Sequence, residues 1–116
     1  MRSTKCPLKT SLLLFFLSFS ALSDSYDGWS DPNTIASIRV YSVNQVLVTM
    51  SSAANPGNCD DTSYLSLYNP DSESGKRAYS ALLTAYAAGK KVNLALAGCT
   101  GGGTHGWPII QQVWLQ

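Results

Sequence analysis

Residues suited to acid–base chemistry are few in this chain of 116 residues. His105 is its one histidine, and catalysis by histidine needs a partner group that orients the ring. The serines and aspartates lie in predicted loops, so the sequence itself identifies no such partner. Asp60 and Asp61 are adjacent, and on an extended loop their carboxylates point apart, without the ligand spacing of an EF-hand. We therefore predict a protein that is not an enzyme and has no metal or cofactor, with all three residues solvated.

The glycine run 101–103 is the next pattern with a chemical meaning. A phosphate-binding P-loop ends such a run with Gly-Lys-Ser or Gly-Lys-Thr and leads into a helix. No lysine follows here, and the next predicted element is a strand after Pro108. Turn preferences instead favour a connection between two strands.

Aromatic residues are frequent and several lie in polar segments. Trp29 and Trp107 are each close to glycine and serine or threonine residues, and Tyr41 lies in a run of alternating residues. An amphipathic ring on a loop is a common recognition surface, and it is equally suited to closing the end of a small barrel. The sequence leaves both roles open, as it does for Trp114, which is either a core or an interface residue.

Residues 1–23 have the pattern of a cleavable secretory signal. Three basic residues precede the apolar run 11–17, and small residues occupy positions 21 and 23. The apolar run is shorter than the roughly 20 residues that a membrane-spanning helix needs. We expect cleavage before Asp24, a secreted or periplasmic location and one domain over 24–116. An uncleaved anchor or a buried helix is the alternative.

The charge of the expected mature domain limits its partners. Five basic residues face seven acidic ones in 24–116, which gives a net charge near −2. A slightly acidic domain without a basic stripe argues against binding to nucleic acid or to anionic lipid.

The cysteines predict one covalent link. Cys6 falls within the signal, so Cys59 and Cys99 remain. In an oxidising compartment an even pair most simply forms a disulfide. Two free thiols or a metal pair are the alternatives, and a structural zinc site would need more ligands than His105 adds.

Hydrophobic periodicity predicts the elements that carry these residues. The polar segment 24–34 is expected to be a loop. Alternation through 35–50, interrupted at Asn44 and Gln45, predicts a β-hairpin, and 64–68 predicts a third strand. After the loop 100–106, residues 109–115 predict a fifth strand.

Between the third and fifth strands the period changes and then returns. Residues 76–88 predict a helix that ends at Gly89, and residues 92–99 predict the fourth strand. The expected core face of the helix has the spacing i, i+3, i+4, i+7 and consists of Tyr79, Leu82, Leu83 and Tyr86.

This order resembles the OB-fold toxin B subunits. Residues 78–94, an aromatic-rich helix followed by a glycine and a valine-led strand, are similar to the binding subunits of subtilase cytotoxin and typhoid toxin. Trp107-Pro108 and Trp29-Ser30-Asp31 are similar to two further elements of that family. The resemblance implies a mainly β, five-stranded OB-fold-like barrel of order β-β-β-α-β-β. It also implies a ring-shaped homo-oligomer, a pentamer, and a serine, here Ser30, that helps to hold a sialylated glycan.

We therefore predict an exported, non-catalytic module that recognises carbohydrate. The candidate glycan-binding residues are Trp29, Ser30, Tyr41 and Trp107. The alternative is a small periplasmic protein that binds another protein as an adapter or inhibitor and has no glycan ligand. A small hydrolase is the least supported class, because His105 stands alone.

Overall fold

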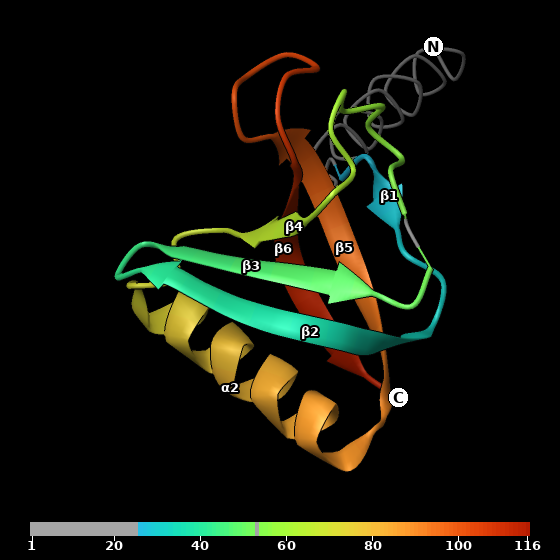
Figure 1. Cartoon of the computed structure of the whole chain (residues 1–116), viewed down its shortest axis with the longest axis vertical. Coiled ribbons are helices and arrows are strands. Elements are labelled where there is room, and N and C mark those ends of the chain that lie inside the picture. Colours follow the sequence, from blue (N-terminus) through green and yellow to red (C-terminus); the bar gives the residue numbers. More distant parts are fainter. Residues whose placement is uncertain (1–25, 53) are drawn as a thin grey trace, which may run out of the picture.

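The alternating run after residue 34 forms the predicted antiparallel hairpin. In the computed structural model, which describes residues 26–52 and 54–116, β2 spans Asn33–Ser42 and β3 spans Gln45–Met50 (Figure 1). Ile38 pairs with Val48, and both pack in the core. Successive side chains on a strand point to opposite faces, so Arg39 lies on the surface turned away from the core, the outer face of the hairpin. The predicted signal, with its cleavage before Asp24, lies outside the described residues.

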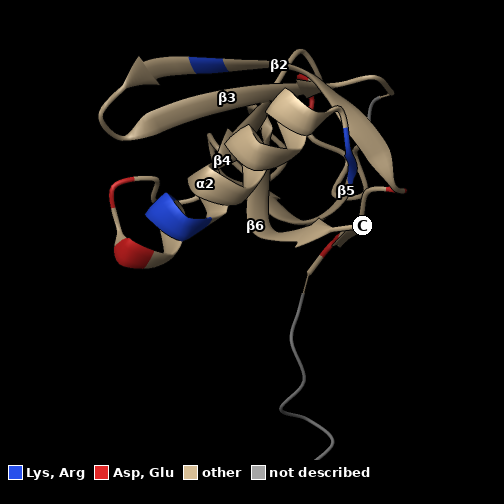
Figure 2. Ribbon diagram, turned by 90° about the horizontal axis from the view of Figure 1, so that it is seen from below, with Lys and Arg blue, Asp and Glu red and all other residues tan. Residues whose placement is uncertain are grey.

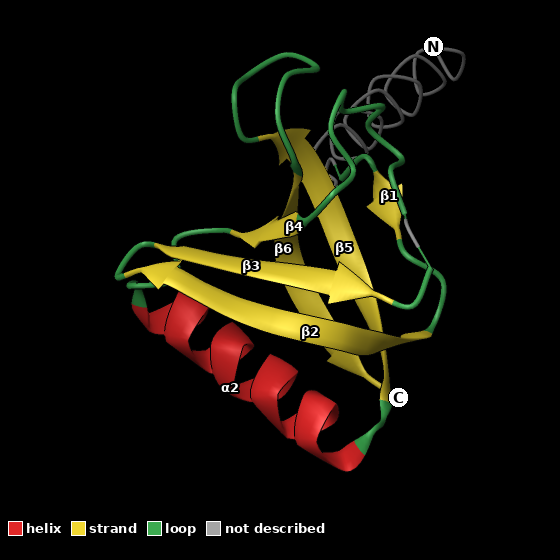
Figure 3. Cartoon of the chain, viewed as in Figure 1, coloured by secondary structure: helices red, strands yellow, loops and turns green. Residues whose placement is uncertain are grey.

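Three further strands close the sheet into a ring. β4 spans Leu65–Leu67, β5 spans Lys91–Cys99 and β6 spans Pro108–Leu115. The ring runs β5-β2-β3-β4-β6 and closes through β5 and β6, with β4 and β6 parallel and the other pairs antiparallel (Figure 3). The predicted five-stranded OB-fold-like barrel with one helix is therefore confirmed.

The prediction that residues 24–34 form only a loop is wrong for part of that segment. Gly28–Trp29 form β1, which pairs with Leu96 and Ala95 of β5, and β2 already begins at Asn33. A strand of two residues has no period to detect, which is why the sequence pattern gives no sign of it. Gly28 suits this position because a Cβ there would lie 2.8 Å from Pro56 Cβ.

Helix α2 spans Glu73–Ala88 and lies against β2 and β6. The Ser72 hydroxyl caps its first turn by accepting a hydrogen bond from the Gly75 N–H, 3.0 Å. Gly89 ends the helix with φ 65°, as predicted.

The helix is rotated relative to the predicted core face. Leu82 is fully buried and Tyr79 packs against the core, but Leu83 and Tyr86 are 40% and 46% exposed. Gly75 and Ala85 are the other buried residues of the helix. Gly75 packs directly on the preceding turn, since a Cβ there would lie 1.9 Å from Asn69 O. The stripe through Gly75, Leu82 and Ala85 is therefore the face turned toward the sheet.

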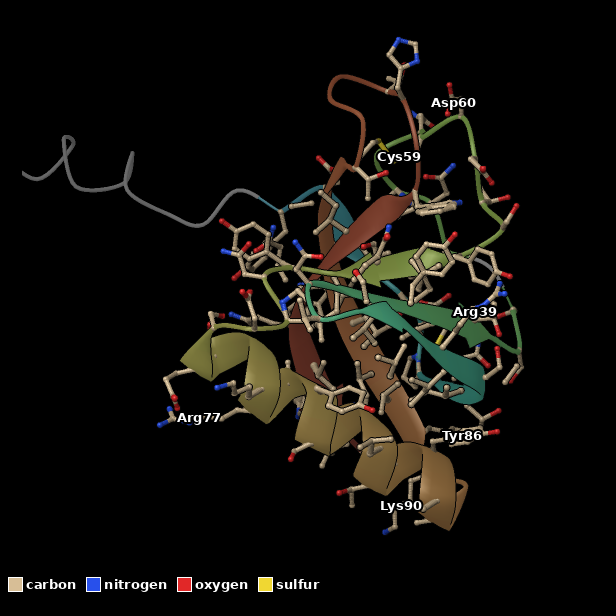
Figure 4. The ribbon with its side chains drawn as sticks, turned by 60° about the vertical axis from the view of Figure 1, so that its left-hand side comes forward. Arg39, Cys59, Asp60, Arg77, Tyr86 and Lys90 are labelled. Atoms are coloured by element: carbon tan, nitrogen blue, oxygen red, sulfur yellow. A yellow bond between two sulfur atoms is a disulfide. The ribbon has the colours of Figure 1, made fainter. Side chains whose placement is uncertain are left out.

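The Cys59–Cys99 disulfide is present, as predicted, with the Cα atoms 5.7 Å apart. It joins the loop between β3 and β4 to the end of β5. Both cysteines are buried, and Asp60 lies exposed beside Cys59 (Figure 4). Within 26–52 and 54–116, no helix has the length and apolar character needed to cross a bilayer.

Candidate functional site

Trp29, at the end of β1, borders a largely polar hollow of the barrel surface. Its side chain is 42% exposed. The hollow, here called the Trp29 groove, has a volume of about 320 Å³. Its lining combines the indole ring with short polar side chains and two small apolar residues: Trp29, Ser30, Asp31, Asn33, Ser52, Ala54, Asn55 and Pro56.

Ser30 also lines the groove, and its polar groups form hydrogen bonds within the barrel. The residue is 3% exposed, its Oγ accepts a hydrogen bond from the Leu94 N–H at 2.9 Å, and its N–H donates to Leu94 O at 2.8 Å. These bonds hold the segment after β1 against β5, which positions Trp29. Of the two hydrogen-bond donors of Ser30, the backbone N–H is used in these bonds and the hydroxyl hydrogen is not.

The walls of the groove are held by side-chain hydrogen bonds. Asn33 Nδ2 donates to Ser52 O at 3.1 Å and also contacts the Ser52 hydroxyl. On the opposite side, Asn55 Nδ2 donates to Cys59 O at 2.8 Å, and Asn55 Oδ1 accepts from the Cys59 N–H at 2.9 Å. The Asp31 carboxylate is exposed and makes no hydrogen bond or ion pair with any residue of the described part. It is therefore the free acceptor of the groove.

Trp29 also belongs to an aromatic cluster that joins β1 to β6. Its ring meets those of Tyr26 and Trp114 edge to face, with centroids 6.2 and 5.9 Å apart. Tyr26 is fixed in turn by Gln112, whose Nε2 donates to Tyr26 Oη at 2.8 Å. Trp114 is 58% exposed, so it is not a core residue, which was one of the two roles that the sequence left open. Contacts with Tyr26 and Trp114 thus restrict the orientation of the Trp29 ring.

The other two predicted site residues lie outside the groove. Tyr41 is on β2 beside Arg39, and Trp107 precedes β6 and packs edge to face on Tyr64 with centroids 5.6 Å apart. The four candidate residues therefore divide into two pairs: Trp29 with Ser30 line one groove, and Tyr41 with Trp107 belong to a different part of the surface.

His105 has a partner that the sequence did not identify. Its Nδ1 lies 3.2 Å from Asp60 Oδ2, and the Gly106 N–H donates to Asp60 Oδ1 at 2.8 Å. These bonds, the Gly106 bond above all, lower the pKa of Asp60. The pKa of Asp61 is lowered by Ser63, whose hydroxyl donates to Asp61 Oδ1 at 2.6 Å. The two carboxylates thus have separate partners, and both belong to the loop tips above the barrel.

Asp60→Asn should change the acid sensitivity of these loops. A carboxyl group with a lowered folded pKa stabilises the fold fully above its unfolded pKa, and this contribution is lost as the pH falls through the folded value. We therefore expect the stability difference between wild type and Asp60→Asn to be constant above pH 3.8, the ordinary aspartate value, and to shrink below it. Urea unfolding at several pH values measures this difference, with Asp71→Asn as control. Parallel acid profiles for wild type and Asp60→Asn would contradict the assignment.

Within the described ranges 26–52 and 54–116, no group of three or more histidine, cysteine, aspartate or glutamate residues could hold an ion. His105 and Asp60 are both exposed, at side-chain fractions of 77% and 58%, so the pair lacks the enclosed surroundings of a catalytic dyad.

Comparison with family models finds no match, and comparison with curated proteins and with solved structures finds no similar protein. Inference about function therefore rests on the geometry of the chain itself.

The sequence interpretation missed most of the groove. Asn33, Ser52 and Asn55 are short polar residues in or next to loops, where such residues are ordinary turn formers. Only pairing of β2 with β5, and closure of the loop by Cys59, brings them together around Trp29.

Proposed function

We propose that this chain is an exported, non-catalytic module that binds carbohydrate in the Trp29 groove. The observation that carries the proposal is the lining of that groove, where one exposed indole ring adjoins hydroxyl, amide and carboxylate groups. A pyranose ring has an apolar face that stacks on an aromatic side chain and a rim of hydroxyls that needs hydrogen-bond partners. The groove offers both kinds of contact.

Each lining residue has a role in this proposal. Trp29 stacks on the sugar ring, and the Asp31 carboxylate accepts hydrogen bonds from its hydroxyls. Ser30 anchors the segment through Leu94 and donates its remaining hydrogen to the ligand. Asn33 and Asn55, already hydrogen-bonded within the protein, shape the two walls.

A shallow groove of this size binds a single glycan weakly. Linked copies of a site raise avidity by about 10²–10⁴. We therefore propose a ring-shaped homo-oligomer, a pentamer by resemblance to the toxin B subunits. Light scattering on the mature chain tests this part of the proposal, and a strict monomer would contradict it.

Trp29→Ala should weaken glycan binding by at least about tenfold, because a tryptophan at the centre of a contact surface commonly accounts for 2 kcal/mol or more. The measurement is retention on a glycan array, followed by titration with the best-bound oligosaccharide. Trp29→Phe should retain part of the affinity, since it keeps an aromatic face.

Tyr68→Ala is the matched control, because Tyr68 is an aromatic residue that is 49% exposed and lies outside the groove. It should bind as wild type does. Equal losses in Trp29→Ala and Tyr68→Ala, or no retention of the wild type on any glycan, would refute the proposed site.

A protein partner is the second candidate, and the tip of the β2–β3 hairpin favours it. Val40, Tyr41 and Val43 are 59%, 66% and 86% exposed. Apolar side chains gathered at one projecting turn are typical of contact surfaces between proteins. A monomer that binds no glycan, and whose binding to a captured protein is lost in Val43→Asp, would favour an adapter or inhibitor.

A further inference from the structure

A row of four side chains runs from β2 to the residues that directly precede β4 and β6. The Arg39 guanidinium lies 5.7 Å from the ring centroid of Tyr41, and its Nη1 donates to Tyr64 Oη at 3.1 Å. The Tyr64 ring meets Trp107 edge to face. Tyr41 and Arg39 are exposed, while Tyr64 and Trp107 are half-buried. The row is therefore a continuous surface of aromatic rings with a cation in its middle.

Arg39 has no acidic partner among residues 26–52 and 54–116. The one ion pair within those ranges joins His105 to Asp60. Tyr64 Oη is the one hydrogen-bond acceptor that Arg39 contacts there, so most of its five N–H donors face solvent. Two tyrosines hold the guanidinium in place, which lowers the entropy that it would lose on binding an anion.

Arg39 is also the one basic residue of β2. Figure 2 shows it as the single blue segment of that strand, with the other described cations on α2 and around the start of β5. Figure 4 likewise places Arg39 on the sheet, away from Arg77 and Lys90 on the helix side. An isolated cation suits a ligand with one anionic group, whereas a polyanion would need several.

We infer that Arg39 is the anion-binding residue of a second ligand subsite, which takes the carboxylate of an acidic sugar. The planar guanidinium matches a carboxylate in a two-bond fork. The Tyr41 ring, 66% exposed, is placed to cover the apolar face of the same sugar, and Tyr64 Oη keeps a hydrogen to donate. The inference rests on the proposed function for the sugar chemistry of the ligand, and it adds the residue that would select acidic over neutral glycans.

The outer face of the hairpin connects this subsite with the Trp29 groove. Arg39 is six positions after Asn33 on β2, a distance of roughly 20 Å along a strand. Paired polar side chains lie in the interval: Thr34 with Ser51, and Ser37 with Thr49. One sugar cannot reach both ends, so the ligand that fits the whole face is an oligosaccharide with its acidic unit at the Arg39 end.

The test uses the full exported chain and pairs of probes that differ in charge. Methyl glucuronide and N-acetylneuraminate are titrated beside their uncharged methyl esters, and binding is followed by the NMR signal of the Arg39 Nε–H group. We expect each acid to shift this signal and to bind about tenfold more tightly than its ester. Equal affinity for acid and ester, or no shift of the Arg39 signal by either acid in the millimolar range, would overturn the inference.

Variants separate this subsite from the groove. Arg39→Gln should lose about tenfold in affinity for the acids and nothing for the esters, and Arg39→Lys should lose less because it keeps the charge without the fork. Arg77→Gln, on the helix, is the control and should bind as wild type. Thermal unfolding of each variant excludes loss of the fold as the cause. Unchanged acid binding in Arg39→Gln would overturn the inference.

The same titrations distinguish failure of the proposed function. Trp29→Ala should leave the carboxylate-dependent shift of the Arg39 signal intact, because Trp29 is not part of the row. A chain in which that shift persists while no glycan engages the Trp29 groove would retain the Arg39 subsite and refute the groove. If Trp29→Ala weakens binding but acid and ester bind alike, the Trp29 groove is retained and the Arg39 subsite is refuted.

Discussion

Serine at both Cys59 and Cys99 should lower the free energy of unfolding by about 4 kcal/mol. The disulfide links residues separated by 40 positions, and in the chain-entropy treatment closure of such a loop restricts the unfolded chain by about that amount. A domain of this size has a total stability of roughly 5–15 kcal/mol, so the loss is a large part of the whole. Urea unfolding of the double variant measures it.

Wild type unfolded in the presence of reductant is the matched comparison and should have the same midpoint as the double variant. The loss should also weaken the neighbouring loop contacts, because the Asp60 N–H donates to Thr104 O at 2.8 Å across the gap that the disulfide spans. A double variant within about 0.5 kcal/mol of wild type, the range of ordinary surface changes, would show that the link contributes little.

Leu82→Ala should cost roughly 2–5 kcal/mol, the range for truncating a fully buried leucine. Leu82 is 0% exposed and packs where α2 meets the ring of strands. Removal of its side chain deletes apolar contacts and leaves a cavity, which the strands on either side can fill only partly. The measurement is urea unfolding, with the slope of the transition checked for constancy.

Leu83→Ala is the control, because it removes the same atoms from the next position of the same helix. Leu83 is 40% exposed, so the loss should be clearly smaller than at Leu82. Equal losses at the two positions would mean that the rotation of the helix described above is wrong. A larger loss at Leu83 would restore the face centred on Tyr79 and Tyr86.

Patterns among neighbouring residues predicted the strands and the helix, whereas the rotation of the helix and the composition of the site depend on contacts between residues distant in sequence. The hairpin, the helix stop at Gly89 and the strand after Pro108 follow from period and turn chemistry, which neighbouring residues carry. The rotation of α2 does not, because it depends on packing of the helix against β2 and β6, which are distant from it in sequence. A periodic run of apolar and aromatic residues gives a face about 100° wide, too broad to decide between Leu82 and Leu83.

The candidate site shows the same limit. Trp29 was recognised because an aromatic residue in a polar segment stands out. The pairing of His105 with Asp60, residues 45 positions apart, could not be recognised, since only the disulfide and the β5–β6 loop bring them together. The separation of Tyr41 from Trp29 follows from strand pairing, because β1 lies beside β5 whereas Tyr41 lies near the far end of β2.

The parallel pairing of β4 with β6 in the ring has a kinetic consequence. The β2–β3 and β5–β6 hairpins join residues close in sequence, so each can form early and locally. The segment between Ser66 and Ile109 contains the whole helix and β5, so pairing of these two residues closes a long loop. The chain loses conformational entropy in that closure before packing of the core can offset the loss. Until then Leu67 and Ile110 are exposed on unpaired edges, where chains aggregate. Cys59 and Cys99 tie the segments that precede β4 and β6, so we expect formation of the disulfide during folding to shorten the time that the chain spends in this vulnerable state.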